Sequence, residues 1–559
     1  MPDSAGTPAA GASPRIDTRT DPTRYRHWRL TVRGARADLV LDVDENAGLF
    51  GGYRLKLNSY DLGVDIELAD ALQRLRFEHP AVKVAVISSA KPRVFCAGAN
   101  IRMLAGASHA HKVNFCKFTN ETRNAMEDAS ANSGLKFVCA IQGTAAGGGY
   151  ELALACDEIL LADDGASAVA LPEVPLLAVL PGTGGLTRVT DKRRVRRDRA
   201  DVFCTLEEGL RGQRAVAWRL VDQAVSKSRF DDAVADAAAR LAASSDRPAE
   251  ATGIALTPIG RHESPDALAY ASVHVALDRA GRRAEITLFG PRGPAPADAA
   301  AMRALGDAFH PLRLARELDD ALLHLRFNEP ELGTLVFRSQ GDAAHVLEHD
   351  RLIAGTDWLA REIRHYWKRV LKRIDVSARS LVALIEPGSC FAGSLAEIVL
   401  ACDRAYMRSS PGGGNETARL TLSPLNFGAL PMANGLSRLA TRFLGEPESL
   451  ERAEQAMEQP LAAEQAVAFG LVTDAFDDID WEDEIRILLE ERASFSPDAL
   501  SGLEANLRFA GPETMETKIF ARLSAWQNWI FMRANATGED GALRRYGTGV
   551  KARFNPERI

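Results

Sequence analysis

The sequence has 559 residues, of which 46% are apolar and 26% charged, and its formal net charge is −7. This length predicts two or more domains, each large enough to bury a core, and the composition excludes a fibrous or wholly disordered chain. The weak negative balance gives no overall attraction for nucleic acid or an anionic membrane, so we predict neither as a partner. No stretch approaches the ~20 apolar residues of a membrane helix.

The first residues and the cysteines together favour a cytoplasmic protein. Residues 1–24 are rich in small, polar and proline residues and lack the apolar stretch of a secretory signal, so we expect them to be disordered. The seven cysteines form no CxxC pair and have no histidine at zinc spacing. This pattern predicts a reducing compartment and no metal site.

A repeat at a shift of 250 residues organises the chain. Residues 67–80 (ELADALQRLRFEHP) recur as residues 317–330 (ELDDALLHLRFNEP). Each copy alternates helix-spaced apolar residues with short strand-like runs, which is typical of an α/β domain. We therefore predict two related α/β units, called here the first half (25–245) and the second half (270–495), with a linker (246–269) between them and a helical C-terminal tail (496–559).

Two small-residue turns in the first half each follow a strand-like run and precede a helix-like run. One is residues 95–100 (FCAGAN), and the other is Gly147-Gly148-Gly149 about fifty residues later. Two such turns can aim two backbone N–H groups at one oxygen that becomes negative during a reaction. Either turn alone would be equally compatible with a tight turn that has no function.

These turns, with the segment LPEVPLLAVLPGTGGLTR that begins at Leu171, resemble the three ordered motifs of the crotonase (enoyl-CoA hydratase/isomerase) superfamily. The resemblance is strong over residues 30–240 and weaker over 270–490. It implies the crotonase-like ββα superhelix in two tandem copies, the second degenerate, followed by C-terminal helices. It also places a thioester oxyanion hole on the N–H groups of Ala99 and Gly148.

The same resemblance assigns the acid/base chemistry. It places the two acid/base glutamates of the hydratases on Glu151 and Glu173, and paired carboxylates suit water addition because one accepts a proton while the other donates. Each glutamate alone could be a solvated helix-end carboxylate. Cys116 falls in the segment that lines the acyl end of these pockets, so we keep it as a candidate contact beside its alternative as a buried apolar residue.

An acyl-CoA substrate carries phosphates and an adenine, so basic residues are expected at the mouth of the pocket. Arg54 and Lys56, which precede the family-like Leu57-Asn58, are candidates, and Ala97 beside the oxyanion loop is a third. The basic run 192–199 is more typical of a solvated face. Asn100 stands where the family often has Asp. CoA is part of the substrate, and the resemblance implies no metal, flavin or nicotinamide and favours a homodimer.

The second copy has lost these groups. At the corresponding positions Ser423 replaces Glu173, residues 341–350 replace the FCAGAN loop, and Gly393-Ser394-Leu395 replaces the glycine turn; only Glu397 remains. We predict an architectural role for this half. Within the superfamily, the chain resembles the double-length members, and this resemblance implies a lyase that adds water to an oxidised (2,3-epoxy or dihydrodiol) benzoyl-CoA. It also implies cleavage of a carbon–carbon bond, which gives formate and an open-chain semialdehyde CoA ester, in aerobic benzoate degradation.

Two alternatives remain open at this point. An enoyl-CoA hydratase or isomerase with an appended domain would use the same two turns and the same two glutamates. A non-catalytic crotonase-like binding protein, for example one that binds RNA, would not need the glutamates at all.

Overall fold

The computed structural model describes residues 15–410 and 417–559. The first half is built on a six-stranded sheet in the order β1-β2-β3-β5-β7-β9, in which only the β1–β2 pair is antiparallel. A smaller parallel sheet, β4-β6-β8, forms beside it. The strands are β1 (Trp28–Arg33), β2 (Arg36–Leu41), β3 (Val84–Ser89), β4 (Val94–Cys96), β5 (Lys136–Ile141), β6 (Thr144–Ala146), β7 (Glu158–Asp163), β8 (Ala168–Ala170) and β9 (Gln223–Ser226).

Helices cover both faces of the large sheet, because its parallel strands are apolar on both sides. The side chains of Val84, Val138 and Leu160 point to one face and pack against Phe230 and Val234 of α9. On the other face lie the long helix α3 and the helix α1, which pack against each other. The helices of this half are α1 (Leu62–Phe77), α2 (Ile101–Gly106), α3 (His109–Ser133), α4 (Gly148–Leu154), α5 (Glu173–Leu177), α6 (Gly185–Thr187), α7 (Arg197–Phe203), α8 (Gly212–Ala217) and α9 (Phe230–Ala243).

The second half repeats this topology. Its sheet runs β12-β13-β14-β15-β16-β17, with one antiparallel pair followed by parallel pairs, as in the first half. Its helix α18 covers the sheet face that corresponds to the face under α9. The sequence repeat therefore reappears as a repeat of strand order. These strands are β12 (Val273–Asp278), β13 (Arg283–Phe289), β14 (Thr334–Gln340), β15 (Ser380–Ile385), β16 (Arg404–Ser409) and β17 (Asp474–Asp477).

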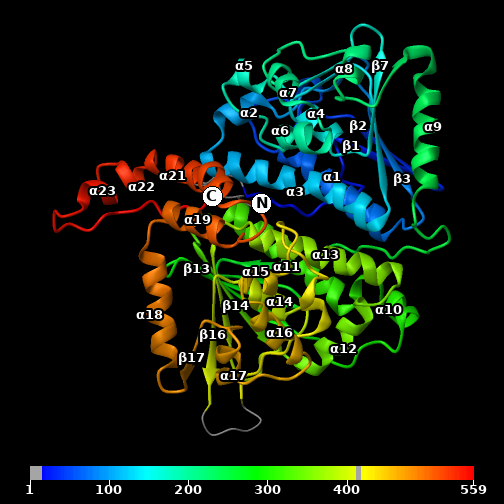
Figure 1. Cartoon of the computed structure of the whole chain (residues 1–559). Coiled ribbons are helices and arrows are strands. Elements are labelled where there is room, and N and C mark those ends of the chain that lie inside the picture. The colour runs from blue at the N-terminus through cyan, green and yellow to red at the C-terminus, as the bar shows by residue number, and fades with distance from the viewer. Residues whose placement is uncertain (1–14, 411–416) are drawn as a thin grey trace, which may run out of the picture.

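The helices of the second half and the tail complete the molecule (Figure 1). The second half contains α10 (Ala299–Leu305), α11 (His310–Asn328), α12 (Ala343–Ile353), α13 (Trp358–Asp375), α14 (Ala396–Ala401), α15 (Arg438–Arg442), α16 (Pro447–Gln455), α17 (Ala463–Ala468) and α18 (Trp481–Ser494). The tail is helical as predicted, with α19 (Pro497–Leu507), α20 (Met515–Thr517), α21 (Ser524–Phe531), α22 (Ala534–Thr537) and α23 (Ala542–Arg545). The described part of the chain contains no helix that is long and apolar enough to cross a membrane.

The structure differs from the sequence-based expectation at both ends of the first half. Residues 1–14 lie outside the described residues, but Ile16 in the predicted disordered start is buried in the core of the first half, and its N–H donates to the side chain of Asn328 in the second half. The predicted linker contributes the strands β10 (His262–Ser264) and β11 (Ala267–Ala269), which extend the second sheet to eight strands. Its Ile254 is buried in the core of the second half.

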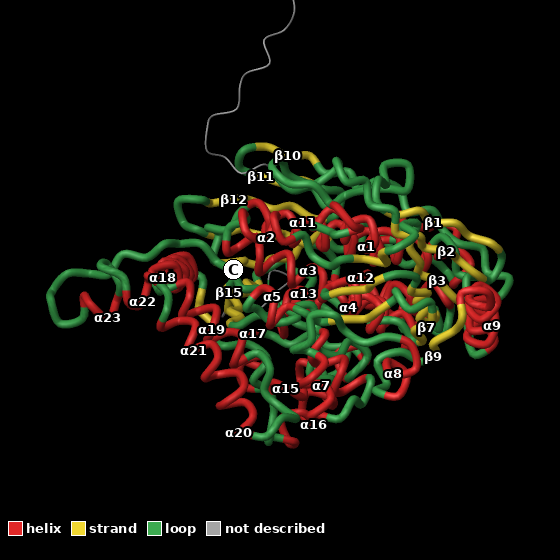
Figure 2. Tube along the Cα trace, turned by 90° about the horizontal axis from the view of Figure 1, so that it is seen from above, coloured by secondary structure: helices red, strands yellow, loops and turns green. Residues whose placement is uncertain are grey.

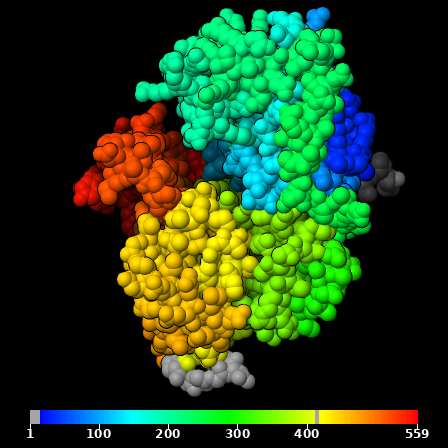
Figure 3. Space-filling model, turned by 45° about the vertical axis from the view of Figure 1, so that its right-hand side comes forward, coloured from blue at the N-terminus to red at the C-terminus, as the bar shows by residue number. Residues whose placement is uncertain are grey.

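The two halves are joined through α1 and α3 on one side and α11 and α13 on the other. Ion pairs cross this junction: the buried Arg76 of α1 bonds Glu362 of α13 at 2.7 Å, and the half-buried Glu121 of α3 bonds Arg326 of α11 at 2.9 Å. Figure 2 shows α3 and α13 side by side in the middle of the molecule. The tail lies beside this junction, and the surface in Figure 3 is recessed where the tail meets both halves.

Candidate active site

The loop that ends β4 is held in a conformation that turns one backbone N–H outward. Gly98 has φ +83°, and a β-carbon there would lie 2.8 Å from the carbonyl oxygen of Ala146, so the turn requires glycine. The Tyr60 N–H donates to the Gly98 carbonyl (3.0 Å), and the Asn100 N–H donates to the Tyr60 carbonyl (2.8 Å). Tyr60 and Ala99 thus form a parallel β-bridge, and in such a bridge the N–H of Ala99 faces away from Tyr60.

The glycine turn places a second N–H beside the first. Gly147 has φ +53° and donates to the Ala170 carbonyl (2.9 Å), and Gly148 then begins α4. A β-carbon on Gly98 would lie 2.9 Å from the Gly148 nitrogen, so the two turns abut. Within the described residues, neither the Ala99 nor the Gly148 N–H donates to another part of the protein. Two free amides in adjoining turns are what an oxyanion hole requires.

Glu151 lies one helical turn into α4 and is buried. Its Oε1 accepts hydrogen bonds from the N–H groups of Thr183 (3.0 Å) and Gly185 (2.7 Å), and its Oε2 accepts one from the Thr183 hydroxyl. Burial raises the pKa of Glu151, and these hydrogen bonds oppose the rise because they stabilise the carboxylate. The arrangement favours Glu151 as the ionised member of the pair.

Glu173 at the start of α5 is the contrasting carboxyl group. It lies against the glycine turn: a β-carbon on Gly147 would be 2.7 Å from its Oε1. Its Oε2 is buried without a hydrogen-bond partner. Burial, and then the negative charge of Glu151, raise the pKa of Glu173 to about 7. Two neighbouring carboxyl groups whose environments separate their pKa values are suited to acid and base roles.

Cys116 of α3 lies close to the carboxylate of Glu151. A β-carbon on Gly182 would be 3.8 Å from its Sγ, and Gly182 directly precedes the Thr183 that binds Glu151. Burial, followed by the charge of Glu151, raises the pKa of the Cys116 thiol to about 11. The group is therefore a protonated thiol at neutral pH and not a thiolate nucleophile.

The three residues predicted to contact CoA lie on the exposed side of the oxyanion loop. Arg54, Lys56 and Ala97 are all exposed, and Arg54 also forms an ion pair with Glu45 at 3.1 Å. Asn100, by contrast, is buried; it caps α2 and donates to the Arg54 carbonyl at 2.8 Å. An aspartate could not donate this bond, so the departure from the family pattern has a local structural reason.

Sequence reasoning missed the residues that complete the site. Thr183 and Gly185 hold Glu151, and Tyr60 lies against Gly148, where a β-carbon would be 1.9 Å from the Tyr60 hydroxyl. Thr183 and Gly185 belong to the PGTGG segment of the third motif, which is the only signal that could have identified them. Tyr60 follows Leu57-Asn58 by two residues but carries no signal of its own.

The second half shows how the equivalent site has been closed. Asp350 of α12, from the segment that replaces the oxyanion loop, accepts a hydrogen bond from the N–H of Ser394 (2.6 Å), the counterpart of Gly148. Glu397, the counterpart of Glu151, is bound by Arg438 and Asn426, each at 2.8 Å. Side chains of the second half therefore bind both the Ser394 N–H and the Glu397 carboxylate, so neither group is free to bind a substrate. This agrees with an architectural role.

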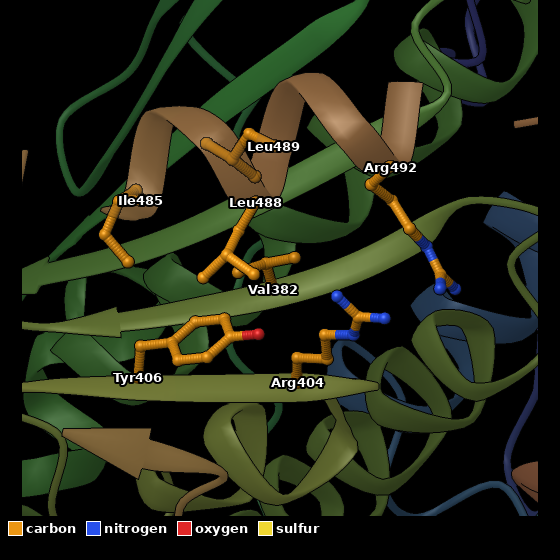
Figure 4. A pocket seen from close by; sticks show the side chains of 7 residues that line it. All are labelled: Val382, Arg404, Tyr406, Ile485, Leu488, Leu489 and Arg492. Atoms are coloured by element: carbon orange, nitrogen blue, oxygen red, sulfur yellow. The ribbon is translucent and has the colours of Figure 1, made fainter. Parts of the chain in front are cut away.

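Two small internal cavities lie in the second half and not at the predicted site. One, of about 10 Å³, lies between the sheet and α18 and is lined by Val382, Arg404, Tyr406, Ile485, Leu488, Leu489 and Arg492 (Figure 4). The other borders Asp350 and Ser394. Each has room for roughly one water molecule, so neither could hold an acyl-CoA. Among the described residues, no cluster of three or more His, Cys, Asp or Glu side chains could hold a metal.

Comparison with known proteins places this geometry in a family. The enoyl-CoA hydratase/isomerase family model matches residues 53–259, a range that contains every predicted site residue. The chain belongs to this superfamily, the crotonases. The similarity extends far beyond the matched range in one case: the benzoyl-CoA-dihydrodiol lyase of Aromatoleum evansii is 55% identical over 546 residues, which are 97% of this chain and 98% of that protein.

Other relatives share only part of the chain. The fatty acid oxidation complex subunit alpha of Aliivibrio fischeri is 30% identical over 37% of this chain and 29% of its own length. A solved enoyl-CoA hydratase from Bacillus anthracis is 25% identical, covers 39% of this chain and 76% of its own, and has a TM-score of 0.33. The predicted superfamily and fold are thus confirmed, while the roles of the site residues stay predictions.

Proposed function

We propose that this protein is a carbon–carbon lyase that opens the ring of an oxidised benzoyl-CoA. The observation that carries the proposal is the 55% identity to a benzoyl-CoA-dihydrodiol lyase, which extends through both halves and the tail. A hydratase with an unrelated appended domain would share only the first half with its relatives. The substrate is the 2,3-epoxide or the dihydrodiol of benzoyl-CoA, and the products are formate and an open-chain semialdehyde CoA ester.

In this proposal the two turns stabilise charge on the thioester. The N–H groups of Ala99 and Gly148 donate to the carbonyl oxygen as electron density moves onto it from the reacting ring. Because both donors are already fixed by the backbone, they need no reorganisation during the reaction. Removal of one such donor typically costs about 2.7 to 4 kcal/mol of transition-state stabilisation.

The two carboxyl groups divide the proton transfers. Glu151, which three hydrogen bonds hold as a carboxylate, takes a proton from the attacking water. Glu173, whose pKa is raised to about 7, donates a proton to the oxygen that leaves carbon as the ring opens. Cys116 borders the acyl end of the site, where its protonated thiol contacts the ring.

The remaining features follow from this assignment. Arg54, Lys56 and Ala97 form the rim that contacts CoA, and no bound cofactor takes part. We divide the chain into a catalytic first half, an architectural second half and a tail that forms a homodimer in the cytoplasm. The tail favours a second copy as its partner because large apolar side chains remain uncovered on it: Phe520 is 74% exposed and Met532 is 80% exposed.

Formate release tests the proposal. The protein is incubated with 2,3-epoxybenzoyl-CoA, with the dihydrodiol and with crotonyl-CoA, and formate and CoA products are measured. We expect formate from an oxidised benzoyl-CoA and loss of at least about 100-fold in Glu151→Gln and Glu173→Gln. Rapid hydration of crotonyl-CoA without any formate would support the hydratase alternative. Salt-sensitive RNA binding that both variants retain would support the binding-protein alternative.

A further inference from the structure

Tyr60 is fixed to the oxyanion loop by its backbone and by the residues before it. Leu57 and Asn58 both have positive φ (58° and 51°), a conformation that side chains rarely adopt. The buried side chain of Asn58 holds this bend by donating to Ser89 Oγ (2.9 Å) and accepting from the Val43 N–H (3.0 Å). The bend delivers Tyr60 to its two backbone bonds with the residues on either side of Ala99.

The ring of Tyr60 is equally constrained. Phe115 packs against it with ring centroids 5.8 Å apart, and the guanidinium carbon of Arg123 lies 5.6 Å from its centroid. Arg123 is itself fixed by a buried ion pair with Asp65 at 2.6 Å. The hydroxyl at the end of this ring therefore has a defined position.

That hydroxyl has no hydrogen-bond partner among the residues that the structure describes. Tyr60 is 3% exposed, and its Oη is buried without a hydrogen bond. A buried hydroxyl without a partner lowers stability, and two other buried tyrosines show the usual pairing: Tyr150 donates to the Leu220 carbonyl (2.7 Å) and Tyr366 donates to Asp319 (3.2 Å). Burial raises the pKa of Tyr60 far above neutrality, so the group is a hydrogen-bond donor at any working pH.

The unpaired hydroxyl lies beside one of the two predicted oxyanion donors. A β-carbon on Gly148 would be 1.9 Å from Tyr60 Oη, which places the oxygen within about 3.4 Å of the Gly148 α-carbon, given a bond of about 1.5 Å. An oxygen that accepts from the Gly148 N–H at about 2.9 Å lies about 3.8 Å from the same α-carbon. Both oxygens lie near the same α-carbon, and this proximity is compatible with one substrate oxygen that accepts from the amide and from the hydroxyl.

We propose that the Tyr60 hydroxyl is a third donor to the thioester oxygen, beside the N–H groups of Ala99 and Gly148. This inference rests on the proposed function for the position of the thioester, but it applies to any acyl-CoA that the site converts. In this proposal the bond forms when substrate is bound, and it gives the buried hydroxyl a partner.

Tyr60→Phe tests the proposal because it removes one oxygen, and no described residue forms a hydrogen bond with that oxygen. We expect kcat to fall about 100-fold with KM little changed, while the midpoint of thermal unfolding stays the same or rises. With 13C-carbonyl benzoyl-CoA bound, the infrared carbonyl stretch should move to higher frequency in the variant. The matched control is Tyr270→Phe in the second half, which loses a hydrogen bond to Asp320 and should lower the midpoint without a change in kcat.

Turnover is measured on 2,3-epoxybenzoyl-CoA and on crotonyl-CoA with each variant. A kcat for Tyr60→Phe within about threefold of the original, an unshifted carbonyl stretch, or a loss of activity that merely follows a loss of stability would each overturn the role of Tyr60. Hydration of crotonyl-CoA without formate would overturn the proposed substrate. The effect of Tyr60→Phe on the rate of that hydration would then decide whether the Tyr60 hydroxyl donates to the thioester oxygen. Absence of turnover with both esters would overturn both proposals.

Discussion

The pair Glu151–Glu173 makes a prediction in which stability and activity change in opposite directions. Glu173→Gln replaces a carboxyl group whose pKa is raised to about 7 with a neutral side chain of the same shape. The folded protein binds a proton at this position more tightly than the unfolded chain, in which the pKa is near 4.5. Stability of the original protein must therefore fall as pH rises from about 4.5 to about 7.

The size of this effect follows from the two pKa values. One pKa unit corresponds to about 1.4 kcal/mol. The rise in the pKa of Glu173 from 4.5 to about 7 therefore lowers the free energy of unfolding by about 3 kcal/mol at a pH where Glu173 is ionised in both the folded and the unfolded protein. At pH 5 the same relation gives less than about 1 kcal/mol. The full value is an upper bound, because the new amide also finds no partner at Oε2. We expect Glu173→Gln to be more stable by about 2 kcal/mol at pH 8 and nearly unchanged at pH 4.

Urea unfolding at pH 4 and pH 8, followed by fluorescence, measures the difference. Formate release measured in parallel should fall about 100-fold or more, since the acid is lost. Glu127→Gln is the control of opposite sign: although burial opposes it, the bonds and charges of Arg188 and Lys192 lower the pKa of Glu127, so this variant should be less stable at pH 8. Equal stability of Glu173→Gln and the original protein at pH 8 would refute the argument that burial and the charge of Glu151 destabilise the ionised Glu173.

Four further predictions concern the same network. With the acid ionising near pH 7, kcat/KM should decline above that pH in the original protein; a profile that instead rises through pH 7 would assign Glu173 as the base. Thr183→Val removes the hydroxyl that bonds Glu151 and should lower kcat about tenfold, while Thr183→Ser retains it; equal rates for both would contradict this role. Asp350→Asn keeps an acceptor for the Ser394 N–H but removes a buried charge whose pKa burial raises to about 7, so it should raise stability at pH 8 and leave formate release unchanged; reduced release would contradict an architectural second half. Iodoacetamide should modify Cys116 more slowly than a free thiol at pH 7.5, because its pKa is about 11, and rapid labelling would contradict the burial of this thiol.

The sequence was informative wherever a structural feature depends on local residue order. The repeat of residues 67–80 at 317–330 predicted two related units, and the same strand order in both halves agrees with it. The glycines at 98 and 147 marked turns that require positive φ, and both have it. The family resemblance then placed the two acid/base roles on Glu151 and Glu173. In the structure, Glu173 lies against the Gly147 turn and Glu151 lies against Gly185. Composition was a weaker guide: Ile16 in the polar first segment is buried and bonds Asn328, and the predicted linker adds two strands to the second sheet.

Contacts between distant segments were decided only by the tertiary structure. Thr183 bonds Glu151 across 32 positions, and Asp350 occupies the N–H of Ser394 across 44. Neither pairing has a periodicity or a spacing that could reveal it, because a hydrogen bond depends on where the fold brings two atoms. Tyr60 is the clearest case: its phenol is an ordinary core side chain by sequence, and only its position against Gly148 leaves the hydroxyl buried and unpaired. Local chemistry thus determined the turns and the carboxyl groups, whereas the folded chain determined which donors surround them.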